Sequence, residues 1–547
     1  MSNIVHLRPT ANSKEFIVNG QPFLMRAAEL QNSSLTSAEY MDTCWENLAA
    51  MHINTILGAC TWEDIEPEEG KFTFSELDKV ILGARKHGIR LVLLWFGSFK
   101  NGVSTYTPAW VKADPKRFPR ALLRKIGDEI EVSDALTLFS PESVKADARA
   151  FGRLMQHLKE FDSKEQTVIM IQVENETGLL YDTRDRSAMA ERVFNSPVPD
   201  HLIDFLKNDW DHLHPELTKF LETKEKLVQG SYAYHLSRYV DEVAAAGKKE
   251  YPIPLYTNVW LNYVSEDADN DFPTLVGGGG YPGDYPSGGP VPNVLDIWQH
   301  NAPHLDTIAC DLYLNDYAST CRNYRHRNQP LFIPEQRRDE YGARRIWVAY
   351  GSYQAWGVSP FGIDTLDAAS CPFTRQYALL ESVEAHVLDA QRRPGSSAGF
   401  YFDPLREDGT DPNQPIKLRL AGSDYELTIE RAFVFGKPGP ACGMVIHKGD
   451  NKFLCIGWGF KVIGKSLSPT SIYTSVLTCE EKYVVNKKTG ELKTLRKLGG
   501  DETQSGKFAN MPNEDPDYGD FPICVTIPSR TMICEVSFYH IDAADIQ

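Results

Sequence analysis

The feature that most constrains the fold is a unit repeated along the first two thirds of the chain. Each unit has a short apolar run, a turn, and a stretch with apolar residues at helical spacing. Residues 53–59, 91–96 (LVLLWF) and 168–173 (VIMIQV) are three of the apolar runs. The stretch after the first run carries one apolar stripe, formed by Leu77, Val80, Ile81 and Ala84. Apolar strands that alternate with helices are typical of a parallel sheet covered on both faces.

Five further apolar runs bring the number of predicted strands to eight, and they lie at residues 23–30, 254–259, 307–313, 331–334 and 358–362. Eight parallel strands, each followed by a helix, are able to close into a barrel. At 547 residues the chain is too long for one hydrophobic core, so a second domain is expected beside the barrel. We therefore predict an α/β fold, a (β/α)8 or TIM barrel, over residues 1–390.

Two segments interrupt the alternation. Residues 182–226 are rich in charge and are predicted to be a helical insertion, whereas residues 277–292 hold too many Gly and Pro for helix or strand and predict a loop over the C-terminal rim. Over residues 396–547, short β-branched or aromatic runs predict a smaller all-β, sandwich-like domain. The strands predicted there are 398–402, 425–429, 432–435, 443–447, 453–458, 471–477, 482–485 and 534–540.

Charge and composition exclude several classes of partner. The formal net charge of −17 repels nucleic acid, and no apolar run approaches the roughly 18 residues that cross a bilayer, so neither nucleic acid nor a membrane is an expected partner. Ten cysteines without C-x-x-C spacing predict buried thiols in a reducing compartment. Residues 1–15 lack a basic segment followed by an apolar one, which predicts a cytoplasmic location, or a secreted one if a leader was removed. Oligomeric state stays open, a homo-oligomer included.

Two of the predicted strands end in carboxylates. Residues 169–178 read IMIQVENETG, and residues 331–336 read LFIPEQ. A buried barrel strand cannot hold ionised groups midway without leaving charges unpaired, so Glu176 and Glu335 are expected at the open C-terminal mouth. Glu174 is the nearest rival of Glu176 for that place.

Paired carboxyl groups at one mouth suit glycoside hydrolysis. Hydrolysis with retention of configuration needs two carboxyl groups about 5 to 5.5 Å apart. One stays protonated and donates to the leaving oxygen, while the other stays ionised and attacks the anomeric carbon, because burial and neighbouring charge separate their pKa values. Two strand ends that face each other across a barrel mouth are able to supply that separation.

Longer segments carry a resemblance to known glycosidases. Residues 54–78 (NTILGACTWEDIEPEEGKFTFSELD) are similar to the strand-two segment of family 35 and family 42 β-galactosidases. Residues 23–34 (FLMRAAELQNSS) and 95–112 (WFGSFKNGVSTYTPAWVK) resemble the microbial branch of glycoside hydrolase family 35, which carries a β-rich C-terminal domain. The Asn175-Glu176 pair and Glu335 look like the acid/base and nucleophile of clan A, at the ends of strands four and seven.

The resemblance implies a retaining exo-β-galactosidase that acts on terminal non-reducing β-D-galactosyl residues, with Glu176 as proton donor and Glu335 as nucleophile. It also implies a carbohydrate substrate, no metal and no organic cofactor. Asn175 is expected to bond the sugar 2-hydroxyl and Tyr313 to hold the nucleophile. Trp62 and Trp356 are candidate stacking platforms for the sugar ring. Further candidates for binding sugar hydroxyls are Glu29, Glu63, Lys100, Asn101 and Asn258.

Several alternatives remain open at this point. Thr177 follows Glu176 where Tyr is common in the family, which leaves β-glucosidase or β-fucosidase specificity open, and a catalytically decayed carbohydrate-binding barrel is the non-enzyme alternative. Glu174 is expected as an ion-paired supporter, of Arg or Lys. The H-x-H at residues 212–214 would suit a metal-dependent hydrolase, but it lies inside the charged insertion, where a helix surface is the favoured interpretation.

Overall fold

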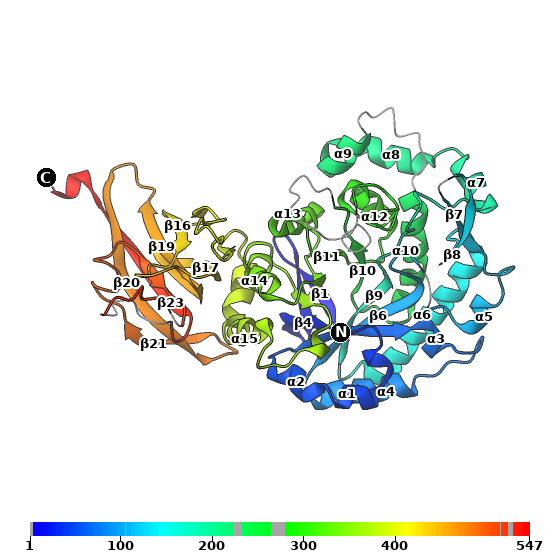
Figure 1. Cartoon of the computed structure of the whole chain (residues 1–547), viewed down its shortest axis with the longest axis horizontal. Helices are drawn as coiled ribbons and strands as arrows, with labels where there is room; N and C mark the ends of the chain where they lie inside the picture. The colour runs from blue at the N-terminus through cyan, green and yellow to red at the C-terminus, as the bar shows by residue number, and fades with distance from the viewer. Residues whose placement is uncertain are drawn as a thin grey trace. The chain divides into compact units, whose positions relative to one another are not determined.

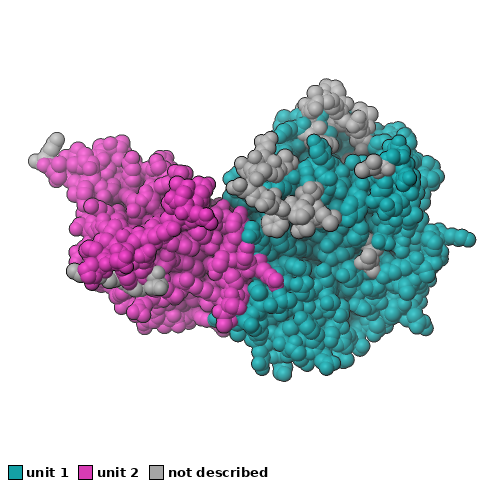
Figure 2. All heavy atoms as spheres, in the orientation of Figure 1, with its two compact units in different colours: residues 1–8, 14–337, 356–368 teal, residues 9–13, 338–355, 369–547 magenta. Residues whose placement is uncertain are grey.

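The computed structural model describes residues 4–103, 106–125, 127–221, 232–263, 279–514, 516–522 and 529–546. The chain divides into two compact units, coloured teal and magenta in Figure 2. The first unit holds residues 1–8, 14–337 and 356–368, and the second holds residues 9–13, 338–355 and 369–547.

The first unit is an eight-stranded parallel barrel, as the sequence predicts. Its strands are β4 (Met25–Glu29), β5 (Thr55–Thr61), β6 (Arg90–Lys100), β9 (Val168–Asn175), β10 (Leu255–Trp260), β11 (Thr307–Asp311), β12 (Ile333–Gln336) and β13 (Gly357–Pro360). They pair in the order β11-β10-β9-β6-β5-β4-β13-β12, and a parallel bridge between Leu312 and Gln336 joins the two ends of this sheet. Figure 1 shows β4, β6, β9, β10 and β11 at the centre of the unit with helices around them.

Helices follow the strands because each stretch at helical spacing buries one apolar face. In α4 (Ser75–Lys86) the buried residues are Leu77, Val80, Ile81 and Ala84, the stripe that the sequence predicts. The other helices beside the barrel strands are α1 (Ala38–Asp42), α2 (Trp45–Ala50), α3 (Trp62–Ile65), α5 (Ala109–Lys112), α6 (Pro141–Asp162), α10 (Tyr232–Glu250), α12 (Leu295–Asn301) and α13 (Tyr317–Asn323).

The two predicted insertions appear in the described residues. The first contains α7 (Ala188–Phe194), α8 (Asp200–Asn208) and α9 (Pro215–Leu221), and its residues 222–226 lie outside the described residues. Residues 279–291 form turns without helix or long strand, while residues 277 and 278 lie outside the described residues. Two short sheets were not predicted: β1 (His6–Pro9) with β2 (Lys14–Val18) and β3 (Gln21–Pro22), and the hairpin of β7 (Arg120–Arg124) and β8 (Ile130–Leu136).

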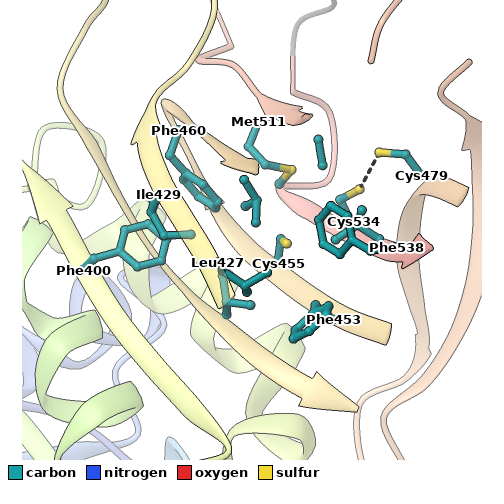
Figure 3. Close-up of a cluster of buried hydrophobic side chains, with 14 of the residues drawn as sticks. Phe400, Leu427, Ile429, Phe453, Cys455, Phe460, Cys479, Met511, Cys534 and Phe538 are labelled. Atoms are coloured by element: carbon teal, nitrogen blue, oxygen red, sulfur yellow. Dashed lines mark hydrogen bonds between the residues drawn. The ribbon is translucent and has the colours of Figure 1, made fainter. Parts of the chain in front are cut away.

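The second unit contains the all-β region, which begins at β14 as two antiparallel sheets. One sheet has the order β14 (Ser397–Phe402), β17 (Ala441–Gly449), β18 (Lys452–Trp458), β23 (Ile533–Asp542), β20 (Ser471–Asn486) and β21 (Glu491–Lys497). The other has the order β15 (Ile416–Arg419), β16 (Tyr425–Arg431), β19 (Phe460–Ser466) and β22 (Ala509–Met511). Residues of both sheets, such as Leu427, Phe453 and Phe460, share one buried core (Figure 3).

Some details of this unit differ from expectation. Residues 432–435 form no strand, and the strands predicted at 471–477 and 482–485 are one continuous strand, β20. Two helices, α14 (Glu340–Ser352) and α15 (Pro372–Gln391), belong to this unit, although the sequence analysis assigned them to the barrel domain. In α14, Arg344 and Arg345 form ion pairs with Asp403, which follows β14, so this helix is bound to the β-sheet region by charge.

Cysteine and membrane expectations are tested only in part. The nine described cysteines are all buried and unbridged, and Cys524 lies outside the described residues. Among the described residues, none of the helices combines the length and apolarity needed to cross a bilayer.

Candidate active site

Six barrel strands contribute polar side chains to one mouth. Glu29 ends β4, Lys100 ends β6, Asn175 ends β9 with Glu176 next to it, Asn258 lies in β10, Asp311 ends β11, and Glu335 lies in β12. The C-terminal ends of parallel strands meet at the same edge, which is where barrel enzymes place their reacting groups. These residues are distant in sequence, and closure of the barrel brings them together.

The two predicted catalytic carboxylates converge. One carboxyl oxygen each from Glu176, Asp311 and Glu335 lie within 4.8 Å of one another. Glu176 and Glu335 are each 7% exposed, so both are nearly enclosed without being sealed from solvent.

Hydrogen bonds hold Glu335 by its carboxylate and Glu176 by its backbone N–H. The Tyr313 hydroxyl donates to Glu335 Oε2 at 2.9 Å, the contact that the resemblance implies. Asn258 Nδ2 donates to Asp311 Oδ2 at 2.8 Å and to Glu335 Oε1 at 3.4 Å, and Asn258 Oδ1 accepts from the backbone N–H of Glu176 at 2.8 Å. Asn258 therefore connects the strand ends that carry the three carboxyl groups.

Burial and crowding of negative charge keep protons on this site at neutral pH. Burial first, and the charge of Glu335 second, raise the pKa of Glu176 to about 8, while Lys100 acts in the opposite direction. Burial, together with the charges of Glu335 and Glu176, raises the pKa of Asp311 well above its usual value. A protonated Asp311 is able to donate a hydrogen bond to Glu176. Glu176 is therefore equipped to act as a proton donor near neutral pH.

Other predicted ligands surround the pair. Lys100 Nζ donates to Asn175 Oδ1 at 2.8 Å, and the backbone N–H of Asn101 donates to the backbone oxygen of Asn175 at 3.2 Å. Asn175 Nδ2 and both carboxyl oxygens of Glu29 are buried and have no hydrogen-bond partner among the described residues. Such groups are costly unless a ligand or water satisfies them. The charges of Glu335, Lys100 and Glu176 all act on Glu29, which places its carboxyl group in the same mouth.

The stacking platforms predicted at Trp62 and Trp356 are wrong. Trp62 has no exposed surface, and its Nε1 donates to Glu66 Oε2 at 2.9 Å. Trp356 directly precedes β13, at the N-terminal end of that strand, and its Nε1 donates to the backbone oxygen of Lys14 at 2.7 Å. The mouth lies at the other end of the strands, and neither ring offers a free face to a sugar.

Two further predictions need correction. Glu63 forms an ion pair with Lys112 at 2.7 Å on a partly exposed surface and has no described contact with the two catalytic candidates. Among the described residues no Arg or Lys forms an ion pair with Glu174, whose carboxyl group faces Asp147 and accepts from the backbone N–H of Phe99 at 2.7 Å. Sequence reasoning also missed Asp311 as a site residue. The segment ACDLY, with its Asp two residues before Tyr313, was the available signal.

The carboxyl groups at the mouth are also the candidate ligands for a metal ion. Among the described residues, Glu176, Asp311 and Glu335 are the one group of three or more His, Cys, Asp or Glu side chains that is spaced to hold an ion. Carboxylate oxygens suit a hard divalent cation. The H-x-H motif does not form such a group: the His214 side chain is buried beside His326, whereas that of His212 is 78% exposed.

Two parts of the chain match known family models. Residues 34–223, which include several of the strand ends at the mouth, match the family model described as β-galactosidase. The matched model is that of glycoside hydrolase family 42, and it spans the segment from α1 past Glu176. Residues 373–510 match a model described as a domain of unknown function, DUF5597. No curated protein matches the chain.

Solved structures match the chain at low sequence identity and low TM-score. The β-galactosidase from Bacillus circulans sp. alkalophilus is 16% identical, with a TM-score of 0.41 over 67% of this chain and 57% of that one. The cold-adapted β-galactosidase from Rahnella sp. R3 is 16% identical, with a TM-score of 0.41 over 70% of this chain and 58% of that one. The catalytic domain of β-amylase from Paenibacillus polymyxa is 9% identical, with a TM-score of 0.45 over 64% of this chain and 96% of that one. The chain thus spans less than two thirds of the two β-galactosidases.

Proposed function

We propose that this chain is a retaining exo-β-galactosidase, which hydrolyses terminal non-reducing β-D-galactosyl residues by double displacement. The observation that carries the proposal is the separation of at most 4.8 Å between carboxyl oxygens of Glu176 and Glu335. Retaining glycosidases place these groups about 5 to 5.5 Å apart, whereas inverting enzymes need about 6.5 to 9.5 Å to admit a water molecule. The short separation favours direct attack on the sugar.

The two glutamates have complementary roles in this mechanism. In the first step, Glu335 attacks the anomeric carbon while protonated Glu176 donates its proton to the departing glycosidic oxygen, so a covalent glycosyl ester forms on Glu335. In the second step, ionised Glu176 takes a proton from water, and the resulting hydroxyl attacks the anomeric carbon and releases Glu335. The raised pKa of Glu176 supplies the proton for the first step.

Unsatisfied polar groups around the pair support a sugar ligand. Asn175 Nδ2 is available to bond the 2-hydroxyl, and the two free oxygens of Glu29 are available to form hydrogen bonds with two neighbouring hydroxyls. Lys100 and Asn258 complete the polar lining and hold Asn175 and the backbone of Glu176 in place. A buried site that bonds hydroxyl groups discriminates strongly against sugars that lack them.

The finer assignment within the class rests on sequence resemblance. The family model that matches is that of family 42, while segments 23–34 and 95–112 resemble family 35, so membership of family 35 stays part of this proposal. β-Glucosidase or β-fucosidase activity would use the same mechanism on another sugar. A decayed binding barrel is disfavoured because the Glu335 carboxylate and the Glu176 backbone N–H keep their hydrogen bonds.

Replacement of each glutamate tests the proposal. Glu335→Gln is expected to abolish turnover of an aryl β-galactoside, since the amide does not attack the anomeric carbon. Glu176→Ala is expected to slow substrates with poor leaving groups by about 10² to 10⁴-fold but to spare glycosylation by activated aryl substrates. With those activated substrates azide is expected to rescue turnover, because it replaces water in the second step without needing a base. Glu160→Gln, on the exposed face of α6, is the matched control.

The outcomes separate the alternatives. Near-wild-type turnover by Glu335→Gln would refute the assignment of the nucleophile. Turnover of aryl β-glucosides or β-fucosides in preference to β-galactosides would keep the mechanism and change the sugar. No turnover of any aryl glycoside, with galactose still bound in a titration, would show a binding protein.

A further inference from the structure

A large bulge in β6 lies directly before Lys100. In the pairing of β6 with β9, Trp95 lies opposite Val173 and Lys100 lies opposite Asn175. Over this interval β6 therefore advances five residues while β9 advances two. The four residues of β6 from Phe96 to Phe99 form a bulge opposite Glu174, and bulges of this kind re-aim the side chains that follow them.

Two buried acidic side chains lie under the bulge. Trp95 Nε1 donates to Asp147 Oδ1 at 2.9 Å, and the backbone N–H of Ser98 donates to Asp147 Oδ2 at 3.1 Å. The backbone N–H of Phe99 donates to Glu174 Oε2 at 2.7 Å. Both carboxyl groups have no exposed surface, so these hydrogen bonds are fully sheltered from water.

The two carboxyl groups lie close to each other. A Cβ atom built on Gly97 would lie 2.6 Å from Glu174 Oε1 and 2.7 Å from Asp147 Oδ1, so these oxygens flank one point above the glycine. No N–H or O–H of the described residues donates to Glu174 Oε1. Two ionised carboxylates do not remain buried side by side, because their repulsion and loss of hydration are both unfavourable. A proton on Glu174 Oε1, donated to Asp147, satisfies both oxygens.

The surroundings decide which group holds the proton. Burial raises the pKa of Glu174 well above its usual value, and Asp147 raises it further through its charge and hydrogen bond, although backbone N–H groups of Phe99 and Ser98 act in the opposite direction. Burial also raises the pKa of Asp147, but hydrogen bonds from Glu174, Ser98 and Trp95 counteract the effect of burial there. In this pair Glu174 therefore holds the proton, and Asp147 is the ionised partner.

The bulge leads straight into the active site. Lys100 Nζ donates to Asn175 Oδ1 at 2.8 Å, and the backbone N–H groups of Asn101 and Gly102 donate to the backbone oxygens of Asn175 and Glu176 at 3.2 Å each. Residues 100–102 therefore bind the two residues that follow Glu174. A shift of the bulge would move Lys100 away from Asn175 and from the acid/base.

We propose that Glu174 and Asp147 share one proton and that Glu174, kept neutral, is a positioning residue that fixes the bulge and thereby places Lys100 against Asn175 beside Glu176. This inference rests on the proposed function for its kinetic consequences. Glu174 does not touch the reacting atoms, so it differs in kind from Glu176, although the two carboxyl groups are only two residues apart.

Three substitutions test this role. Glu174→Gln keeps a neutral side chain of the same shape, with an amide donor for Asp147 and a carbonyl acceptor for Phe99, so we expect kcat/KM within about threefold of wild type. Glu174→Leu keeps the volume but removes both hydrogen bonds, and we expect kcat to fall by about tenfold to a hundredfold because Lys100 is misplaced. Glu176→Gln is the comparison, with loss of activity on substrates with poor leaving groups.

A pH profile separates positioning from a merely structural role. Lys100 opposes protonation of Glu176. Displacement of Lys100 in Glu174→Leu is therefore expected to shift the alkaline limb of kcat/KM to higher pH, while Glu174→Gln leaves the limb in place. Loss of activity in Glu174→Gln as large as in Glu176→Gln would overturn the inference. Unchanged kcat and an unchanged limb in Glu174→Leu would overturn it too.

An infrared measurement tests the shared proton without reference to catalysis. In D2O, the difference spectrum of wild type minus Glu174→Gln is expected to show the band of one buried carboxylic-acid carbonyl, and the difference spectrum of wild type minus the control Glu160→Gln is expected to lack it. If no glycoside is hydrolysed, the proposed function fails, and this band then decides the inference alone. Identical spectra for wild type and Glu174→Gln would refute the shared proton. This test does not use Glu174→Leu, so it decides the inference even where that variant fails to fold.

Discussion

The protonation of Glu176 leads to a quantitative prediction about pH. The acid must hold its proton in the first step, so activity is full below its pKa and is lost as pH rises through it. At the ordinary value of 4.5, only about 0.3% of Glu176 would be protonated at pH 7, whereas at about 8 roughly 90% is. The surroundings of Glu176 therefore increase the reactive fraction by roughly 300-fold.

Two features of the site account for this effect. Burial is the larger, and the charge of Glu335 is the second. At a separation of at most 4.8 Å and an effective dielectric constant of about 20, repulsion between the two carboxylates is of the order of 3.5 kcal/mol. The positive charge of Lys100 lowers the pKa of Glu176, so Lys100→Met is expected to raise this pKa further.

The assay is kcat/KM of an aryl β-galactoside with a poor leaving group, measured from pH 5 to pH 10. We expect wild type to lose activity above about pH 8 with the slope of a single ionisation. We expect Lys100→Met to move this limb to higher pH. Glu176→Ala, measured on the same substrate, is expected to keep only a low residual rate and to lack the limb. If the limb persists unchanged in Glu176→Ala, another group titrates and the reasoning is wrong.

Three further predictions concern the lining, the excluded tryptophan and metals. Glu29→Gln is expected to raise KM for the galactoside by about tenfold, because both Glu29 oxygens are buried and free for hydroxyl groups; unchanged kinetics would remove Glu29 from the site. Trp356→Phe is expected to lower the free energy of unfolding by about 1 to 3 kcal/mol through the lost bond to Lys14, measured by urea denaturation, with KM unchanged; a higher KM would restore the stacking role. Dialysis against EDTA is expected to leave kcat unchanged, and a loss reversed by Mg²⁺ would show that the carboxylate trio holds a cation.

The sequence predicted the barrel because buried parallel strands leave a strong mark. All eight barrel strands overlap the predicted apolar runs, since each strand is covered on both faces and is therefore rich in apolar residues. The abrupt change from apolar to acidic residues at 173–176 and 333–335 marks the end of a strand at the mouth. That argument placed Glu176 and Glu335 correctly at one edge, because every strand of a parallel barrel ends on the same side.

The errors at Trp62 and Trp356 have a physical reason. An aromatic residue beside a strand has the same pattern whether it lies at the mouth, at the opposite end or beneath a helix. Trp356 lies one residue before β13, and its hydrogen bond to the Lys14 backbone fixes it at the N-terminal end. Trp62 begins α3 and donates to Glu66 one helical turn later. Only the three-dimensional path of the chain distinguishes these places.

The pair Glu174 and Glu176 shows where pattern reasoning reaches its limit. In a regular strand, residues two apart point to the same face, so the sequence would give both carboxyl groups one environment. The backbone instead adopts left-handed φ values of 61° at Glu174 and 43° at Glu176, a conformation that costs a non-glycine residue roughly 1 to 3 kcal/mol. The N–H of Phe99 binds the Glu174 side chain, and Asn258 binds the N–H of Glu176, so contacts from other strands hold the irregular path. As a result one carboxyl group faces Asp147 beneath the bulge of β6, and the other faces Glu335 across the mouth. Two glutamates that look equivalent in the sequence thus acquire different chemistry from contacts that only the closed barrel provides.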